Sequence, residues 1–269
     1  MKHSAIILCL ILLSTGYVSA QTSPRYFGAL AYPVPDLPDS IHKFWGELKY
    51  NYTLGDAKDY AMAAIIEANI PLFSDRVSIS CWFPIQEYWF YTRKRVKECG
   101  MRNIKEYYKG HDYGDAIIHT NIKVFTEKKI RPEFIIRCAL KTASTANGFN
   151  VHRFYDDGGC FFDGTFNKSY KNFTFSLTSG FLCWNTCIDQ QNDATMYGLR
   201  IAYKNPYFVL TTHYGGYAGW QGHGDCPMVI REHLLLHTPK SKFSLGLHFT
   251  RGLNDYPYSI FECGIRFDW

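Results

Sequence analysis

The sequence predicts an all-β protein: a closed, antiparallel, up-and-down transmembrane β-barrel of about twelve strands. Three observations predict this fold. The chain ends in a segment with one apolar and one charged face, it begins with a segment that has the pattern of an export signal, and period-two segments separated by turns fill the length between them. Aromatic residues make up 17% of the chain, and a barrel places many of them at its two membrane interfaces.

The C-terminal residues 261–269 alternate between apolar and polar side chains. Residues two apart share one face of a strand. One face therefore carries Phe261, Cys263, Ile265, Phe267 and Trp269. The other face carries Glu262, Gly264, Arg266 and Asp268. Lipid outside and a polar lumen inside explain both faces, whereas a soluble core would not tolerate the charged one.

The N-terminal residues 1–20 have the pattern of a secretory signal peptide. Lys2 gives a positive start, residues 6–13 form an apolar core, and residues 18–20 form a small-residue cleavage site. The apolar core is too short for a spanning helix, and no later stretch approaches about 18 continuous apolar residues. If the mature chain crosses a membrane, it does so with strands.

Apolar residues recur at every second position in segments between these two ends. Residues 45–53 are typical, because Leu48 and Tyr50 would share one face and Glu47 and Lys49 the other. Segment 228–237 is the weakest, since its apolar face includes Glu232, which is unfavourable at mid-bilayer. We expect Glu232 to lie towards a membrane interface or a β-bulge to occur there.

The connections between the predicted strands alternate in length. One set of connections is short and rich in turn residues, at 72–75, 127–131, 168–172, 205–206 and 238–241. The long ones are 93–114, 145–159, 185–193 and 218–227, and the links 55–59 and 254–257 are short exceptions on the same side. Short turns at one end and long loops at the other are typical of membrane barrels with an even number of strands.

Four segments near the C-terminus read GLRIAY, GGYAGW, GDCPM and RGLNDYP, at 198–203, 215–220, 224–228 and 251–257. With the aromatic last strand, they resemble the hairpin ends of one class of Gram-negative outer-membrane β-barrels, over about residues 44–269. The resemblance implies an outer-membrane location and brings no activity with it. It also implies that Phe267 and Trp269 form the signal read by the barrel-assembly machinery.

The predicted organisation is a signal peptide at 1–20, a proline-rich periplasmic lead-in at 21–41 and the barrel at 42–269. The expected surroundings are outer-membrane lipid and lipopolysaccharide. The formal net charge is +5, with no basic run that would indicate nucleic-acid binding. No motif indicates a cofactor, and no Cys or His spacing indicates a metal site.

The charged side chains of the strands fall mainly on the predicted inner face. Those expected in the lumen are Glu47, Lys49, Glu67, Lys123, Arg137, Lys141, Arg200, Glu262 and Arg266. Small barrels of about eight strands are filled, whereas porins of 16–18 strands leave a channel. About twelve strands therefore allow a narrow, anion-leaning pore, or a lumen plugged by paired charges that bridge the walls. Glycines that could make room for large inward neighbours are Gly164, Gly198, Gly246 and Gly264.

The cysteines divide between faces and loops. Those on predicted lipid faces, as small apolar fillers, are Cys81, Cys138, Cys183 and Cys263. Those in or beside loops are Cys99, Cys160, Cys187 and Cys226. An oxidising envelope permits disulfides among the second group, but spacing does not decide their pairing, and they could also stay reduced.

We expect a structural or binding scaffold, or a narrow pore, without catalytic activity. One alternative is an outer-membrane lipid-modifying enzyme, although no predicted strand pairs His with Ser two residues away, as a nucleophile and its base would require. The nearest match is His248 with Thr250. Another alternative is a soluble secreted β protein with disulfides, which would use the glycosylation sequons at Asn51, Asn167 and Asn172.

Loop 93–114 mixes basic and tyrosine side chains. Its basic residues are Arg93, Lys94, Arg95, Lys97, Arg102, Lys105 and Lys109. Such a surface could bind lipopolysaccharide phosphates through charge-assisted hydrogen bonds. The alternative is a solvated loop whose charges only keep it soluble.

Deleting Trp269, or replacing it with a charged residue, should reduce insertion into the outer membrane, because the lipid-facing row loses the aromatic residue that the assembly machinery is expected to read. Membrane fractionation with heat-modifiable gel mobility measures the inserted fraction. Normal insertion of the shortened chain would argue against the resemblance.

Overall fold

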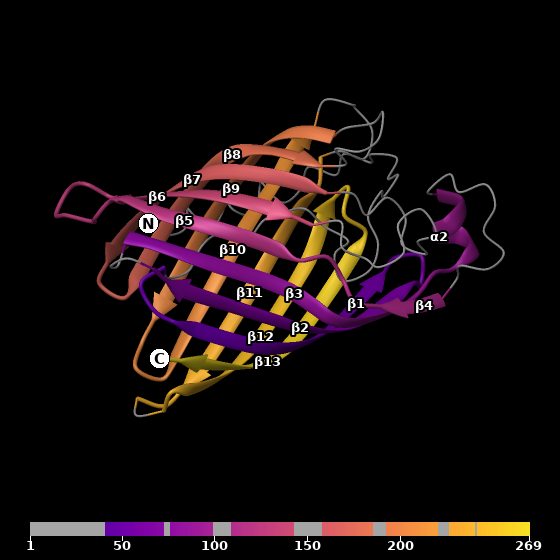
Figure 1. Cartoon of the computed structure of the whole chain (residues 1–269), viewed down its shortest axis with the longest axis horizontal. Coiled ribbons are helices and arrows are strands. Elements are labelled where there is room, and N and C mark those ends of the chain that lie inside the picture. Colours follow the sequence, from indigo (N-terminus) through magenta and orange to yellow (C-terminus); the bar gives the residue numbers. More distant parts are fainter. Residues whose placement is uncertain are drawn as a thin grey trace, which may run out of the picture.

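The computed structural model describes residues 41–72, 76–98, 109–142, 158–184, 192–219, 226–239 and 241–269. Twelve of its strands form a closed antiparallel barrel, as the sequence predicts (Figure 1). The barrel strands are β1 (Trp45–Gly55), β2 (Tyr60–Pro71), β3 (Val77–Phe90), β5 (Ile117–Phe125), β6 (Glu133–Lys141), β7 (Gly159–Tyr170), β8 (Phe173–Trp184), β9 (Asn192–Lys204), β10 (Phe208–Gly219), β11 (Met228–His237), β12 (Phe243–Asn254) and β13 (Tyr258–Asp268).

Each strand pairs with its neighbour in the chain, and β1 closes the barrel against β13 from Trp45–Asp268 to Gly55–Tyr258. The short strand β4 (Lys109–Asp112) pairs only with the end of β3. The helix α2 (Arg93–Glu98) lies at the same end of the barrel, opposite the end where the chain terminates (Figure 1). We call these the loop end and the turn end. Among the described residues, no helix is long and apolar enough to cross a membrane.

The outer surface is apolar. Exposed leucines, isoleucines and aromatics lie on the outward faces, and Leu48 and Leu199 are each more than half exposed. Aromatic rings line the turn end, for example Phe134 beside Phe166 and Phe243 beside Phe267, with ring centroids 4.5 and 5.2 Å apart. An apolar band edged by aromatics is the surface that a membrane barrel presents to lipid.

Two local expectations were wrong. Period-two alternation from Ser78 and Ser80 predicts that Gln86 faces inward. The β2–β3 register shifts between Ala64 and Ile65, however, so Ala64 pairs with Gln86 and Ile65 pairs with Pro84. The extra residue, Ile85, turns Gln86 outward, because a bulge exchanges the two faces of a strand. Segment 93–114, predicted as one loop, contains α2 and β4.

A single cysteine introduced as Leu199→Cys or Leu245→Cys, with the native cysteines replaced, should resist aqueous maleimide in intact membranes and react with a bilayer-soluble probe. Both positions point outward from the apolar band. Lys171→Cys, in the exposed turn between β7 and β8, is the control and should react with both reagents. Ready aqueous labelling at 199 and 245 would contradict the register.

Candidate functional site

The lumen contains a buried network of charged side chains. Arg137 on β6 and Asp163 on β7 are directly opposite each other. The guanidinium donates from Nε to Asp163 Oδ2 at 2.8 Å, and Nη2 lies 2.7 Å from the same oxygen as an ion pair. Thr165 donates to the other oxygen of Asp163 at 3.4 Å and lies 2.5 Å from Thr178. The pair is almost fully buried, and a pair so placed persists because each charge compensates the other.

A second cluster lies where β1 meets β2 and β13. Lys49 Nζ lies 2.7 Å from Glu67 Oε2 and 3.8 Å from Glu262 Oε2. Asn51 donates to the other oxygen of Glu262 at 2.9 Å. Asn51, which begins a glycosylation sequon, is therefore an inward residue that is only 1% exposed. Its burial is incompatible with a glycan in the folded barrel.

Glycines let Glu47 reach beyond its neighbouring strand. The Glu47 carboxylate lies 3.0 Å from His248 Nε2 on β12, although β13 lies between the two strands. A Cβ at Gly246 or Gly264 would come within 2.4 or 2.7 Å of Glu47 Oε1. The expected space-making role is thus observed at these two glycines. The His248 ring also meets His233 edge to face, with centroids 4.5 Å apart.

The other predicted charges also lie on the inner face. Lys123 lies 3.3 Å from His42, Lys141 lies 2.7 Å from Asp115, and Arg200 donates to Ser176 at 3.3 Å. Arg266 pairs with Asp268 at 3.0 Å. Most of these ion pairs join strands that are adjacent or one strand apart. His42, which precedes β1, is an exception, because it lies 3.3 Å from Lys123 on β5 and 3.5 Å from Glu133 on β6, with β2 and β3 between. This cluster therefore spans several strands at the turn end.

Sequence analysis missed three members of this network. Arg231 is buried and lies 3.2 Å from His213, while Glu133 accepts from Asn167 at 3.1 Å. Asp115, the partner of Lys141, precedes its strand. Arg231 follows from the register of β11, since its neighbour Glu232 faces outward. Glu133 and Asp115 lie at or just before the start of a strand, where alternation gives no signal.

A layer of buried, mainly apolar side chains lies on the inner face of the barrel at the loop end. Its residues come from β5 to β11, from β13 and from the turn before β13, and none is more than 8% exposed. They are Ile117, Ala139, Phe161, Leu182, Ala194, Met196, Tyr217, Val229, Tyr256, Tyr258 and Ile260. This layer leaves its side chains almost no contact with water.

Arg95 of α2 joins the helix to this layer. Its guanidinium lies 5.1 Å above the Tyr258 ring, donates to Asp59 at 3.1 Å and pairs with Asp56. Burial alone would lower the pKa of Arg95, but Tyr258, Asp59 and Asp56 raise it above its ordinary value, so the side chain stays charged. Arg95 was expected among the surface residues that contact lipopolysaccharide. It is instead fully buried.

The structure describes two of the four cysteines that were predicted in or beside loops, Cys160 and Cys226. Among the described residues, no disulfide joins Cys160 or Cys226 to another cysteine, and Cys99 and Cys187 lie outside the described residues. Cys160 was predicted at a loop edge. It is the second residue of β7, points outward and lies directly opposite Cys183 on β8.

Trp269 is 75% exposed, and its backbone N–H donates to the Phe44 carbonyl at 2.9 Å.

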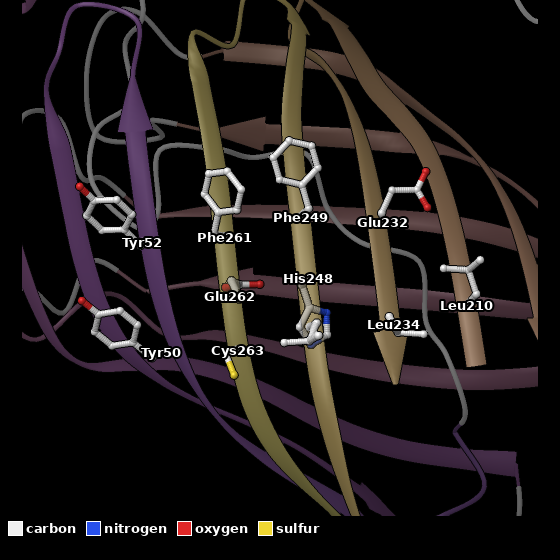
Figure 2. A pocket seen from close by; sticks show the side chains of 11 residues that line it. Tyr50, Tyr52, Leu210, Glu232, Leu234, His248, Phe249, Phe261, Glu262 and Cys263 are labelled. Atoms are coloured by element: carbon white, nitrogen blue, oxygen red, sulfur yellow. The ribbon is translucent and has the colours of Figure 1, made fainter. Parts of the chain in front are cut away.

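The outer wall carries a groove formed by two adjacent rows of outward side chains (Figure 2). One row crosses Leu210, Leu234, Leu247, Cys263 and Tyr50. The next crosses Glu232, Phe249, Phe261 and Tyr52. The groove has a volume of about 600 Å³. Glu232 is the only ionised side chain in these two rows, and it accepts a hydrogen bond from Thr212 at 2.8 Å.

Glu232 is not turned inward. The expected bulge exists, but it lies between Met228 and Val229 and leaves Glu232 on the outer face. Glu232 is the fifth residue of the ten in β11. With a rise of about 3.3 Å per residue and a tilt of about 40°, it lies about 10 Å from the loop end of the strand and about 13 Å from its turn end, near the middle of the strand.

No family model and no curated protein matches this sequence. Solved structures do match. An outer-membrane channel from Pseudomonas putida F1 superposes with a TM-score of 0.58 at 10% identity, covering 87% of this chain and 97% of the channel. The NanC porin superposes with a TM-score of 0.54 at 9% identity, covering 82% and 98%. The chain has the fold of outer-membrane β-barrels. That fold supports an outer-membrane location.

Asp163→Ala should lower the free energy of unfolding by about 3–5 kcal/mol, because it leaves the Arg137 charge buried without its carboxylate. Glu127→Ala is the control. It breaks a 3.0 Å pair with Lys168 in which both side chains are about one-third exposed, so it should change stability by at most about 1 kcal/mol. Denaturant unfolding in lipid vesicles measures both. Equal losses would contradict the buried-pair assignment.

Proposed function

We propose that the protein is a non-catalytic outer-membrane barrel with a closed lumen, which acts as a binding scaffold and not as an open pore. The observation that carries this proposal is the apolar layer at the loop end. Water and ions do not pass a contact layer of apolar side chains unless the layer moves.

The cap on this layer supports the same function. Arg95 holds α2 against the β1–β2 turn through Asp59 and Asp56. Moving the helix away would separate a buried guanidinium from both carboxylates, and breaking a buried pair is strongly destabilising. The loop end is therefore fastened by an interaction that resists opening.

The charged network below the layer supports a structural role for the lumen. Lys49 contacts two carboxylates, and Arg137 is held to Asp163 by a hydrogen bond and an ion pair. Side chains engaged in this way hold the walls together and are poorly suited to transient contacts with a passing solute. The same engagement supports the absence of catalysis, since a reacting group must be able to exchange its partner for substrate.

A second candidate function is a narrow pore that opens when the apolar layer is displaced. The two similar barrels described above are a channel and a porin, which favours this candidate at the level of fold alone. Its basic lumen residues, Lys123, Arg137 and Arg200, would then favour anions.

Single-channel recording in planar bilayers tests the closed lumen. The unaltered protein should show no steady conductance. The triple variant Phe161→Ala, Met196→Ala and Tyr217→Ala should conduct, because it removes three large side chains of the layer from three strands. The control triple Phe162→Ala, Tyr197→Ala and Tyr214→Ala truncates outward neighbours on the same strands and should stay silent.

Steady conductance of the unaltered protein, with preference for anions, would replace the scaffold by the second candidate. A silent inner triple that remains folded by heat-modifiable mobility would show that the layer is not the barrier.

A further inference from the structure

We propose that the outer groove is a binding site for a long-chain 3-hydroxy fatty acid, with its hydroxyl on Glu232, its carboxylate on Arg251 and its hydrocarbon chain along the two rows of side chains. This site is independent of the closed lumen, since it lies on the opposite face of the barrel wall.

The position of Glu232 is the first step. An ionisable group facing lipid near mid-bilayer is unfavourable, and ordinary barrel strands place an apolar residue there. Thr212 donates to Oε2 of Glu232. Among the described residues, no hydrogen bond engages Oε1. The Oε1 oxygen of Glu232 can therefore accept a hydrogen bond from a donor that lies in the groove.

The shape of the site is the second step. The row from Leu210 to Tyr50 crosses five strands, a span of about 19 Å at the usual spacing of about 4.8 Å. Figure 2 shows the aromatic rings of Phe249 and Phe261 side by side along the groove, with centroids 5.0 Å apart. A single extended hydrocarbon chain fits such a narrow apolar hollow. A second copy of the barrel does not, because two hollows placed face to face leave a gap between them.

Arg251 supplies the third step. It follows Phe249 by two positions on β12, so it is a diagonal neighbour of Glu232 at a Cα separation of about 7–8 Å. It is exposed on the outer face, nearer the loop end, and donates to Ser259 at 2.6 Å. A single guanidinium near the outer interface suits a single carboxylate, since the geometry of the two ions matches.

The two groups together select the ligand. An anion at Arg251 and a hydrogen-bond donor at Glu232 must lie a few ångströms apart on one molecule. A 3-hydroxy acid has this arrangement, with the hydroxyl close to the carboxylate and an apolar chain beyond it. A plain fatty acid would leave the acceptor of Glu232 unsatisfied.

The test compares 3-hydroxytetradecanoate with tetradecanoate, each titrated into the full-length barrel in detergent micelles and followed by native mass spectrometry. The unaltered protein should bind the hydroxy acid about tenfold more tightly, the worth of one hydrogen bond to a charged group. In Glu232→Leu this preference should vanish while tetradecanoate binding stays unchanged. Arg251→Ala should weaken both acids about tenfold.

Lys171→Ala is the matched control, since it removes one exposed positive charge from the turn between β7 and β8, outside the groove. It should leave both affinities unchanged. Glu232→Gln, which retains an acceptor, should keep part of the preference, and heat-modifiable mobility checks that each variant is folded. Equal binding of the two acids by the unaltered protein, no binding of either, or a preference that persists in Glu232→Leu would overturn the proposal.

Discussion

The structure depends on the closure of β1 against β13. In lipid, an unpaired backbone N–H or C=O has no water to replace its partner, so an open sheet edge is excluded. Closure requires the last strand to find the first across the whole chain, and their register runs from Trp45–Asp268 to Gly55–Tyr258. Once the ring is closed, each strand has one face towards lipid and one towards the lumen. The chemistry of most strand side chains then follows from the face on which their position places them.

Closure also determines how charge is accommodated. A polar inner face in a narrow barrel becomes a buried polar core, and buried charges need partners. Most partners lie on adjacent strands or one strand further, as for Arg137 with Asp163 and Glu47 with His248. His42 before β1 and Glu133 on β6 instead pair across several strands at the turn end. The loop end carries the apolar layer together with a buried ion pair between Lys141 and Asp115.

Much of this could be read from the sequence because period-two alternation is a local signal. It predicted the fold, the strand order and the inner face of the last strand, including Glu262 and Arg266. It failed where one residue changes the parity, as Ile85 does for Gln86. It also failed at Arg95, since its partners Asp56 and Asp59 lie in another connection. Neither a bulge nor a contact between distant turns leaves a periodic signature.

Glu232 shows the remaining limit of pattern reading. In the sequence, alternation places this charged residue on the lipid-facing side of its strand. An interface position or a β-bulge would each have removed its carboxyl from lipid. The fold uses neither to remove the carboxyl from lipid. Instead Thr212 satisfies one of its oxygens, and the flanking rows form a hollow around it. If the lumen is closed, as proposed above, recognition takes place on the loops or on the outer wall. An ionisable residue that faces lipid, such as Glu232, is therefore a natural place to look for a binding site on the outer wall.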